Sequence, residues 1–178
     1  MTKPTITPSE DTVMTAVRAF FLDLVPDGVE VFKGQANRVP EPIGMNFIVM
    51  TPTGRLRLST NVVTWDRENP DVDTMQHAHD TQFEVQLDIH GPGGSDIAGL
   101  IATLIRDGWG CDNLDAAIVQ PLYATDGHQA PFVNAEQQWE NRWTMTAAFQ
   151  IVPIVSTDQQ FAVTLTPTIV PIIGGLIP

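Results

Sequence analysis

The chain has 178 residues, of which 9 are basic and 21 acidic, so its formal net charge is −12. That length is enough for one domain with a hydrophobic core. The acidic balance excludes nucleic-acid binding by phosphate neutralisation, which needs clustered lysine and arginine. The single cysteine, Cys111, excludes an intramolecular disulfide and a cysteine-rich metal site, and it fits assembly in a reducing cytosol.

The first expected element is a helix near residues 8–25. Thr7 and Glu10 have the spacing of a capping box, and Pro8 suits the first helical position. Ahead of this helix the sequence shows no apolar stretch typical of a signal peptide. No apolar run reaches the length of a bilayer span, so we expect no membrane association. The apolar residues of the helix repeat at helical spacing: Val13, Val17, Phe20, Phe21 and Leu24.

Strands are expected next. Residues 29–35 predict a short strand, and residues 44–60 predict a hairpin with Pro52-Thr53-Gly54 at or beside its turn. Residues 66–75 are polar and contain Pro70, which predicts an extended, exposed loop.

Residues 77–91 alternate between apolar and polar side chains, which predicts a long strand with one buried face. A Gly-Pro-Gly-Gly turn then leads into a second helix near residues 95–107. Ser95 is its expected N-cap, and Gly108 is its expected C′ residue. Its expected buried stripe is Ile97, Leu100, Ile101, Leu104 and Ile105.

The last third of the chain is expected to contain an irregular segment at 111–134, a long strand at 135–155 and another strand at 159–172. Residues 167–178 form an apolar C-terminal arm. Because helices and strands do not alternate regularly, we expect an α+β fold. It is an antiparallel sheet with two main helices packed on it, in a single domain over residues 1–178.

The glycine-rich turn at 91–94 raises the question of phosphate binding, since helix N-termini hold phosphates. A P-loop needs a lysine after its last glycine, whereas Ser95 and Asp96 stand here. The aspartate places negative charge where an anion would sit. We therefore interpret the segment as a turn and expect no nucleotide or other cofactor.

His77 and His79 are spaced to face the same way on a strand, and Asp73 or Asp80 could join them around a metal ion. No third ligand has diagnostic spacing, so a solvated or interface pair is favoured over a metal site.

Nucleophilic catalysis would need a pairing such as Cys111 with His128. The cysteine follows the end of a predicted helix, where the helix dipole disfavours a thiolate. No G-x-S-x-G motif is present. We therefore expect no catalytic residues.

Trp139, Arg142 and Trp143 form a dense group of the residue types enriched at protein interfaces. They are the candidate interface residues. The alternative is that the tryptophans belong to the core and the arginine pairs with an acidic residue.

The same region resembles the neck and tail terminator proteins of tailed phages. The resemblance lies in Pro121-Leu122-Tyr123, Pro131-Phe132-Val133-Asn134 and the segment Gln137–Trp143, and it extends loosely over most of the chain. It implies a small fold with an antiparallel sheet and flanking helices. It also implies a ring, usually six-fold, that caps the tail tube and joins the neck, without catalytic residues.

The resemblance leads us to expect a virion structural protein, assembled in the host cytoplasm. Its expected partners are further copies of itself, the tail tube protein and neck or connector proteins, and it is expected to bind no membrane. DNA would pass through an acidic lumen without specific binding. The alternatives are another virion part, such as a head–tail connector or tail tube subunit, and a small metal-binding enzyme that uses His77 and His79.

Overall fold

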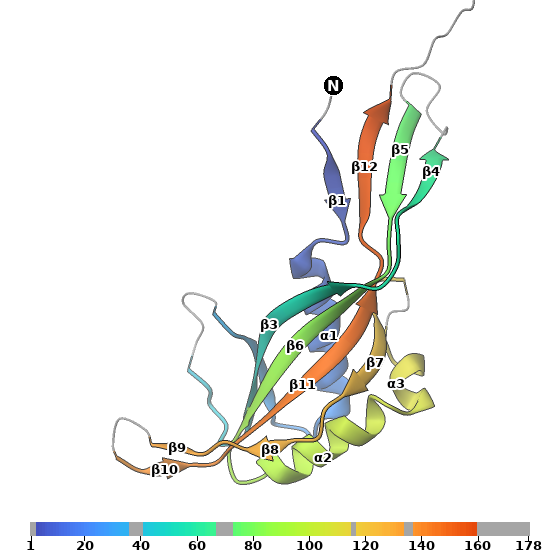
Figure 1. The fold of residues 1–178 in the computed structure, drawn as a ribbon. Helices are drawn as coiled ribbons and strands as arrows, with labels where there is room; N and C mark the ends of the chain where they lie inside the picture. Colours follow the sequence, from blue (N-terminus) through green and yellow to red (C-terminus); the bar gives the residue numbers. More distant parts are fainter. Residues whose placement is uncertain (1–2, 36–40, 67–72, 115–116, 134–136, 160–178) are drawn as a thin grey trace, which may run out of the picture.

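The computed structural model describes residues 3–35, 41–66, 73–114, 117–133 and 137–159. Its body is a six-stranded sheet with helices against one face. A four-stranded sheet, the arm, continues from one end of the body, and a two-stranded hairpin extends from the other end (Figure 1). The expected α+β class with two main helices is confirmed.

The body sheet has the strand order β2-β3-β6-β11-β7, and β8 also pairs with β11. All of these pairings are antiparallel except β2 with β3, which is parallel. Strands β6 and β11 form its centre and pair in register over ten residues. The bounds are β2 (Glu30–Lys33), β3 (Phe47–Arg57), β6 (Thr81–His90), β7 (Gln120–Ala124), β8 (His128–Gln129) and β11 (Arg142–Ile151).

The arm has the order β1-β12-β5-β4, and the hairpin consists of β9 and β10. All arm pairings are antiparallel. Their bounds are β1 (Thr5–Thr7), β4 (Val62–Asp66), β5 (Asp73–Ala78), β12 (Ile154–Gln159), β9 (Phe132–Val133) and β10 (Trp139–Glu140).

Helix α1 (Glu10–Leu24) packs its apolar stripe on the body sheet. Its N-cap is Ser9, whose Oγ accepts a hydrogen bond of 3.2 Å from the backbone N–H of Thr12. The predicted capping box with Thr7 is therefore wrong, because Thr7 is the last residue of β1 and the helix begins after Ser9. The five residues predicted for the stripe are all buried.

Helix α2 (Gly94–Leu104) begins one residue before the expected N-cap Ser95, and its N-cap position is Gly93, with no side-chain capping bond. Gly108 does not end this helix but begins the short α3 (Gly108–Asp112), which Asp107 caps. Both cap predictions are thus wrong. The buried side of α2 includes Ile97, Ala98, Ile101 and Ile105, whereas Leu100 is exposed and Leu104 is only partly buried.

The predicted hairpin over 44–60 is wrong. Strand β3 runs through Pro52 and Gly54, and β6 pairs with both halves of it. The residues that indicated a turn instead form a register shift, a β-bulge, between Pro52 and Gly54. The two features are confused in the sequence because bulges and tight turns use the same residue types.

The polar segment 66–75 is not a loop throughout. Asp66 ends β4 and Asp73 begins β5, so both ends of the segment pair in the arm, and residues 67–72 lie outside the described residues. The reason is non-local: β5 pairs with β12, which lies far along the chain.

The segment 111–134 is more regular than expected, since it contains part of α3 together with β7, β8 and β9. Pro121 does not prevent a strand because β7 is an edge strand. The expected long strand over 135–155 is divided into β10, β11 and the start of β12. Beyond Gln159, the strand expected at 159–172 lies outside the described residues. The apolar C-terminal segment predicted at 167–178 lies wholly outside them.

The core lies between the body sheet and its helices. The predicted alternation of β6 is confirmed: Phe83, Val85, Leu87 and Ile89 are buried. Phe21 of α1 packs edge-on against Phe149 of β11 with ring centroids 6.2 Å apart. No helix among the described residues is long and apolar enough to cross a bilayer.

Candidate functional site

The body sheet has one face without helices, which we call the open face. It carries the polar side chains of β6 and β11, because the apolar ones point toward the helices. Thr144 Oγ1 donates a hydrogen bond of 2.7 Å to Asp88 Oδ1, and Gln86 Nε2 donates one of 2.9 Å to Asp88 Oδ2. Gln82 Nε2 donates to Glu84 Oε1 at 2.7 Å. The open face is thus an ordered polar surface that carries carboxylates.

Arg142, one of the three candidate interface residues, is held by contacts within the chain. Its Nε donates a hydrogen bond of 3.2 Å to the carbonyl oxygen of Ala130 and lies 3.8 Å from Asp88 Oδ1. Its guanidinium lies over the ring of Phe132, 5.5 Å from the centroid. These contacts fix the base of the hairpin against β11.

Aromatic rings line the end of the open face next to the hairpin. The ring of His90 stacks on that of Phe47 with centroids 4.5 Å apart. It also lies in a T-shaped arrangement with the ring of Phe132, with centroids 5.7 Å apart. Burial lowers the pKa of His90, and the nearby Asp88 carboxylate only partly opposes this shift. The Nδ1 atom of His90 is buried and has no hydrogen-bond partner among the described residues.

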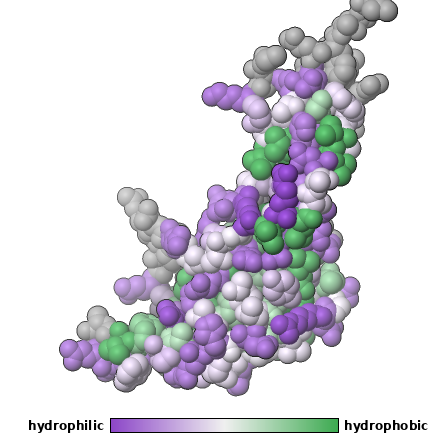
Figure 2. Space-filling model, in the orientation of Figure 1, coloured by the Kyte–Doolittle hydropathy of each residue, from purple (hydrophilic) through white to green (hydrophobic). Residues whose placement is uncertain are grey.

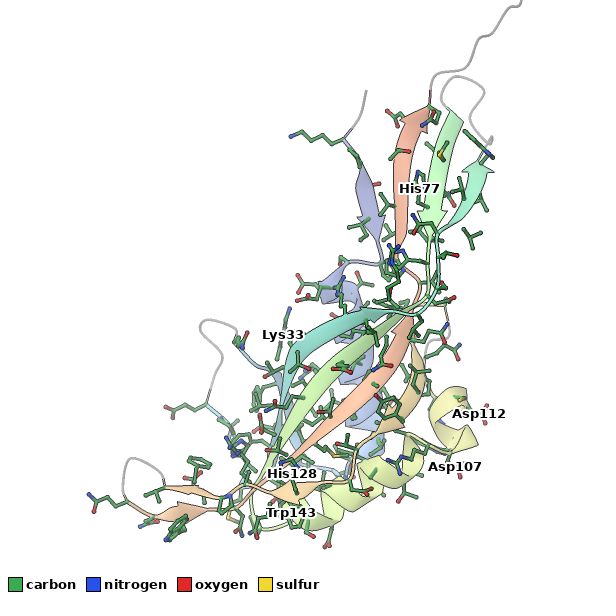
Figure 3. The ribbon with its side chains drawn as sticks, viewed as in Figure 1. Lys33, His77, Asp107, Asp112, His128 and Trp143 are labelled. Atoms are coloured by element: carbon green, nitrogen blue, oxygen red, sulfur yellow. The ribbon has the colours of Figure 1, made fainter. Side chains whose placement is uncertain are left out.

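The two candidate tryptophans have different environments. Trp143 packs against the core beside α2, near Gly94 and Gly127 (Figure 3). Trp139 lies on β10 and is 75% exposed. The chain thus divides the predicted cluster between a core residue, an internally bonded arginine and one exposed ring.

Further apolar side chains are exposed next to Trp139. A cleft of about 550 Å³ lies between the 41–47 segment and the hairpin, and Met45, Phe47, His90 and Trp139 contribute to its lining. Met45 is 80% exposed and Ile43 is 95% exposed. We call Ile43, Met45, Val133 and Trp139 the hairpin patch. Sequence reasoning missed Ile43 and Met45, although two apolar residues in a proline-rich loop are a usable signal.

A second set of exposed apolar side chains lies on the arm and the adjoining end of β3. Val62 is the most exposed of them, at 60%. Figure 2 shows hydrophobic surface on the arm as well as on the hairpin, at opposite ends of the molecule. We call Leu56, Leu58, Val62, Val63 and Trp65 the arm patch. The sequence analysis did not select it.

The histidines do not assemble into one site. His77 lies within β5, between Val63 of β4 and Val155 of β12, whereas His79 lies in the connection to β6. Figure 3 shows His77 on the arm and His128 near Trp143, at the other end of the body. The described residues include no group of three or more histidine, cysteine, aspartate or glutamate side chains able to hold a metal ion.

The segment 91–94 is a turn, as predicted. The Gly91 N–H donates to the carbonyl oxygen of Asn141, the Gly93 N–H to Asn46 Oδ1, and the Gly94 N–H to the Gly91 carbonyl oxygen. These three backbone donors of the turn therefore already have acceptors within the chain. Cys111 is exposed on α3, away from this turn.

An ordered polar sheet face combined with apolar side chains exposed on two extensions is typical of a subunit that assembles with other chains. Residues 11–173 match a family model described as phage neck terminator protein, and the chain belongs to this family. No curated protein matches it. The family is one of virion structural proteins, so membership implies a place in the phage neck and contacts with neck and tail components. The resemblance noted in the sequence is thereby confirmed.

Proposed function

We propose that the protein forms a closed ring at the head-proximal end of the phage tail, where it terminates the tail tube and joins it to the neck. The observation that carries the ring is the exposure of apolar side chains at both ends of the protomer, in the hairpin patch and the arm patch. Cyclic rings use two different patches on each subunit. We expect this ring to have six-fold symmetry, and this expectation comes from the resemblance to terminator proteins.

The charge of the chain supports a lumen through which DNA passes without binding. The net charge is −12, and like charge keeps phosphates from adhering to a surface. We place part of this charge on the lumen. The open face, with Glu84 and Asp88 held in hydrogen bonds, offers such a surface.

Electron microscopy and native mass spectrometry of the full-length protein test the ring directly. We expect a ring of defined symmetry, and antibody labelling at the junction of neck and tail in the virion. Label on the tail tube or on the portal side would favour a tube subunit or a connector. Protein that stays monomeric at high concentration, also when tail tubes are added, contradicts the proposal.

The C-terminal residues 167–178 are apolar and contain three prolines, Pro167, Pro171 and Pro178. We propose that this segment takes part in assembly, because an apolar tail left in water is unfavourable. Its deletion is expected to weaken the ring or its docking to the neighbouring virion ring. The unfolding midpoint of the truncated chain should stay close to that of the full chain; a large drop would instead assign the segment to the core.

A further inference from the structure

We infer that the proposed ring closes when the hairpin patch of one copy docks against the free strand edge of the arm of the next copy. The inference rests on the proposed ring and names the two surfaces that meet. Its occupant is a second copy of this chain, which brings its own hairpin to the edge formed by β4 and the adjoining end of β3.

Among the described residues, the two edges of the arm differ in length and in apolar exposure. Strand β1 forms the first edge, with only three residues between Pro4 and Pro8. Strand β4 forms the other edge and pairs only with β5 among the described residues. Its residues Val62 and Val63 are adjacent and both exposed, so each face of the strand carries an exposed apolar side chain. Short strands and prolines block edge pairing, whereas an apolar edge invites another strand.

This edge continues into the body sheet. Strand β2 pairs with β3 only over Phe47–Met50, so the end of β3 from Gly54 to Arg57 has β6 on one side and no strand on the other among the described residues. Leu56 and Leu58 add exposed apolar surface there. The free edge is therefore long enough to accept a strand pair rather than a single side chain.

The hairpin is short, and an added strand would stabilise it. Strands β9 and β10 pair over only two residues each and form a separate sheet. An isolated two-stranded hairpin is marginally stable in water, and further strands stabilise it. Trp139 on β10 and the neighbouring Met45 are mostly exposed. Pairing with a partner strand would cover these side chains and extend the hairpin.

The position and charge of the two surfaces make them partners between copies. They lie at opposite ends of the protomer, so one chain cannot join its own hairpin to its own arm (Figure 1). Glu41 lines the cleft beside the hairpin patch, and Arg57 lies at the end of β3 beside the arm patch. Opposite charges at the two surfaces favour the head-to-tail pairing and disfavour pairing of two hairpins.

Two variants of the full-length protein test the inference: Val62→Lys on the arm edge and Trp139→Lys on the hairpin. Leu100→Lys is the matched control, because this leucine is an exposed apolar residue of α2 in neither patch. Sedimentation velocity measures assembly, and thermal unfolding verifies that each variant is folded. Where one variant is not folded, Val63→Lys or Met45→Lys replaces it.

We expect each patch variant alone to raise the dissociation constant of assembly at least tenfold, and the control to assemble like the wild type. An equimolar mixture of the two patch variants is the decisive sample. The Val62→Lys chain keeps an intact hairpin and the Trp139→Lys chain keeps an intact arm edge, so the mixture should stop at a heterodimer.

Folded variants that form rings like the wild type would overturn this inference and leave the proposed ring standing. A mixture that remains monomeric would also overturn it, because the two intact surfaces would then not recognise each other. Wild-type protein that stays monomeric with and without tail tubes would contradict the proposed function itself and the inference with it.

Discussion

The carboxylate of Asp80 accepts a hydrogen bond of 2.9 Å from Gln150 Nε2, although the two residues are 70 positions apart in the chain. Asp80 lies where β5 passes into β6. Its backbone N–H donates to Ser59 Oγ at 2.8 Å, and its carbonyl oxygen accepts from the Leu58 N–H at 2.9 Å. One residue therefore connects three chain segments at the junction of arm and body.

Replacing Asp80 by alanine should loosen this junction. The Gln150 amide loses its charged acceptor, and hydrogen bonds to charged groups contribute about 1.5–3 kcal/mol where they are buried. Because the site is half-buried, we expect a loss of about 1 kcal/mol in the free energy of unfolding. Hydrogen exchange should quicken in β5 and β12 more than in β6. Equal changes in arm and body would contradict a local role.

Two glycines should respond to alanine in opposite directions. Gly91 has φ +101°, and a Cβ there would lie 2.1 Å from the carbonyl oxygen of Met45. Gly99 lies in α2, and a Cβ there would meet no atom within 4 Å. We expect Gly91→Ala to cost at least about 2 kcal/mol of stability. Gly99→Ala should add about 0.5–1 kcal/mol, because alanine favours the helix. Urea unfolding measures both values.

Two serines distinguish a helix cap from a residue in the first turn. Ser9 accepts the hydrogen bond from the Thr12 N–H, and its replacement by alanine should cost about 1 kcal/mol. Ser95 is exposed within the first turn of α2 and is not its N-cap. Ser95→Ala should therefore leave the midpoint of chemical unfolding nearly unchanged. Equal losses in the two variants would show that the α2 cap is wrongly located.

His90 should make stability depend on pH. Its folded pKa lies below the ordinary value of 6.5 because of burial, so the unfolded chain binds more protons between the two pKa values. The contribution is complete above about pH 6.5 and is lost as the pH falls toward the folded pKa. His90→Phe keeps a ring against Phe47 and removes the titration.

The His90→Phe variant should accordingly lose less stability than the wild type when the pH falls from about 7.5 to about 5.5. Urea unfolding at both pH values gives the comparison, and His128→Phe is the control at an exposed position. If the two variants and the wild type change equally, His90 does not carry this dependence.

The histidine pair of the sequence analysis remains a prediction to be measured. We expect no structural metal at His77 and His79, since they lie on a strand and in the following connection. Metal analysis of protein purified without chelators is the assay. Stoichiometric zinc in the wild type that disappears in His77→Ala would restore the metal-binding alternative.

Local sequence patterns were sufficient to predict the buried residues of an element that packs one face against the core. The stripe of α1 and the alternation of β6 predicted their buried residues, because burial on a single face imposes the period directly. Leu100 shows the limit of this reasoning, since it has the spacing of the α2 stripe and is nevertheless exposed.

Pairing between distant segments could not be predicted in the same way. The residues Pro52–Gly54 indicate a turn locally, and only the presence of β6 beside both halves of β3 makes them a bulge. The polar ends of the 66–75 segment become strands because β12 pairs with β5. The exposed rings and aliphatic side chains of the two patches depend on the same long-range arrangement, so only Trp139 was selected in advance.

The link between arm and body has a mechanical consequence. Strand β5 is joined to β6, and β11 to β12, by two-residue connections, and β6 and β11 are hydrogen-bonded to each other over ten residues. A pull on the arm along its length is therefore carried directly into the two central strands of the body, which both join the arm at the end of their ladder where Thr81 pairs with Ile151. Because the two strands are pulled from the same end and in the same direction, the load does not slide them past each other. The arm is thus attached to the core through paired strands and not through a single connection.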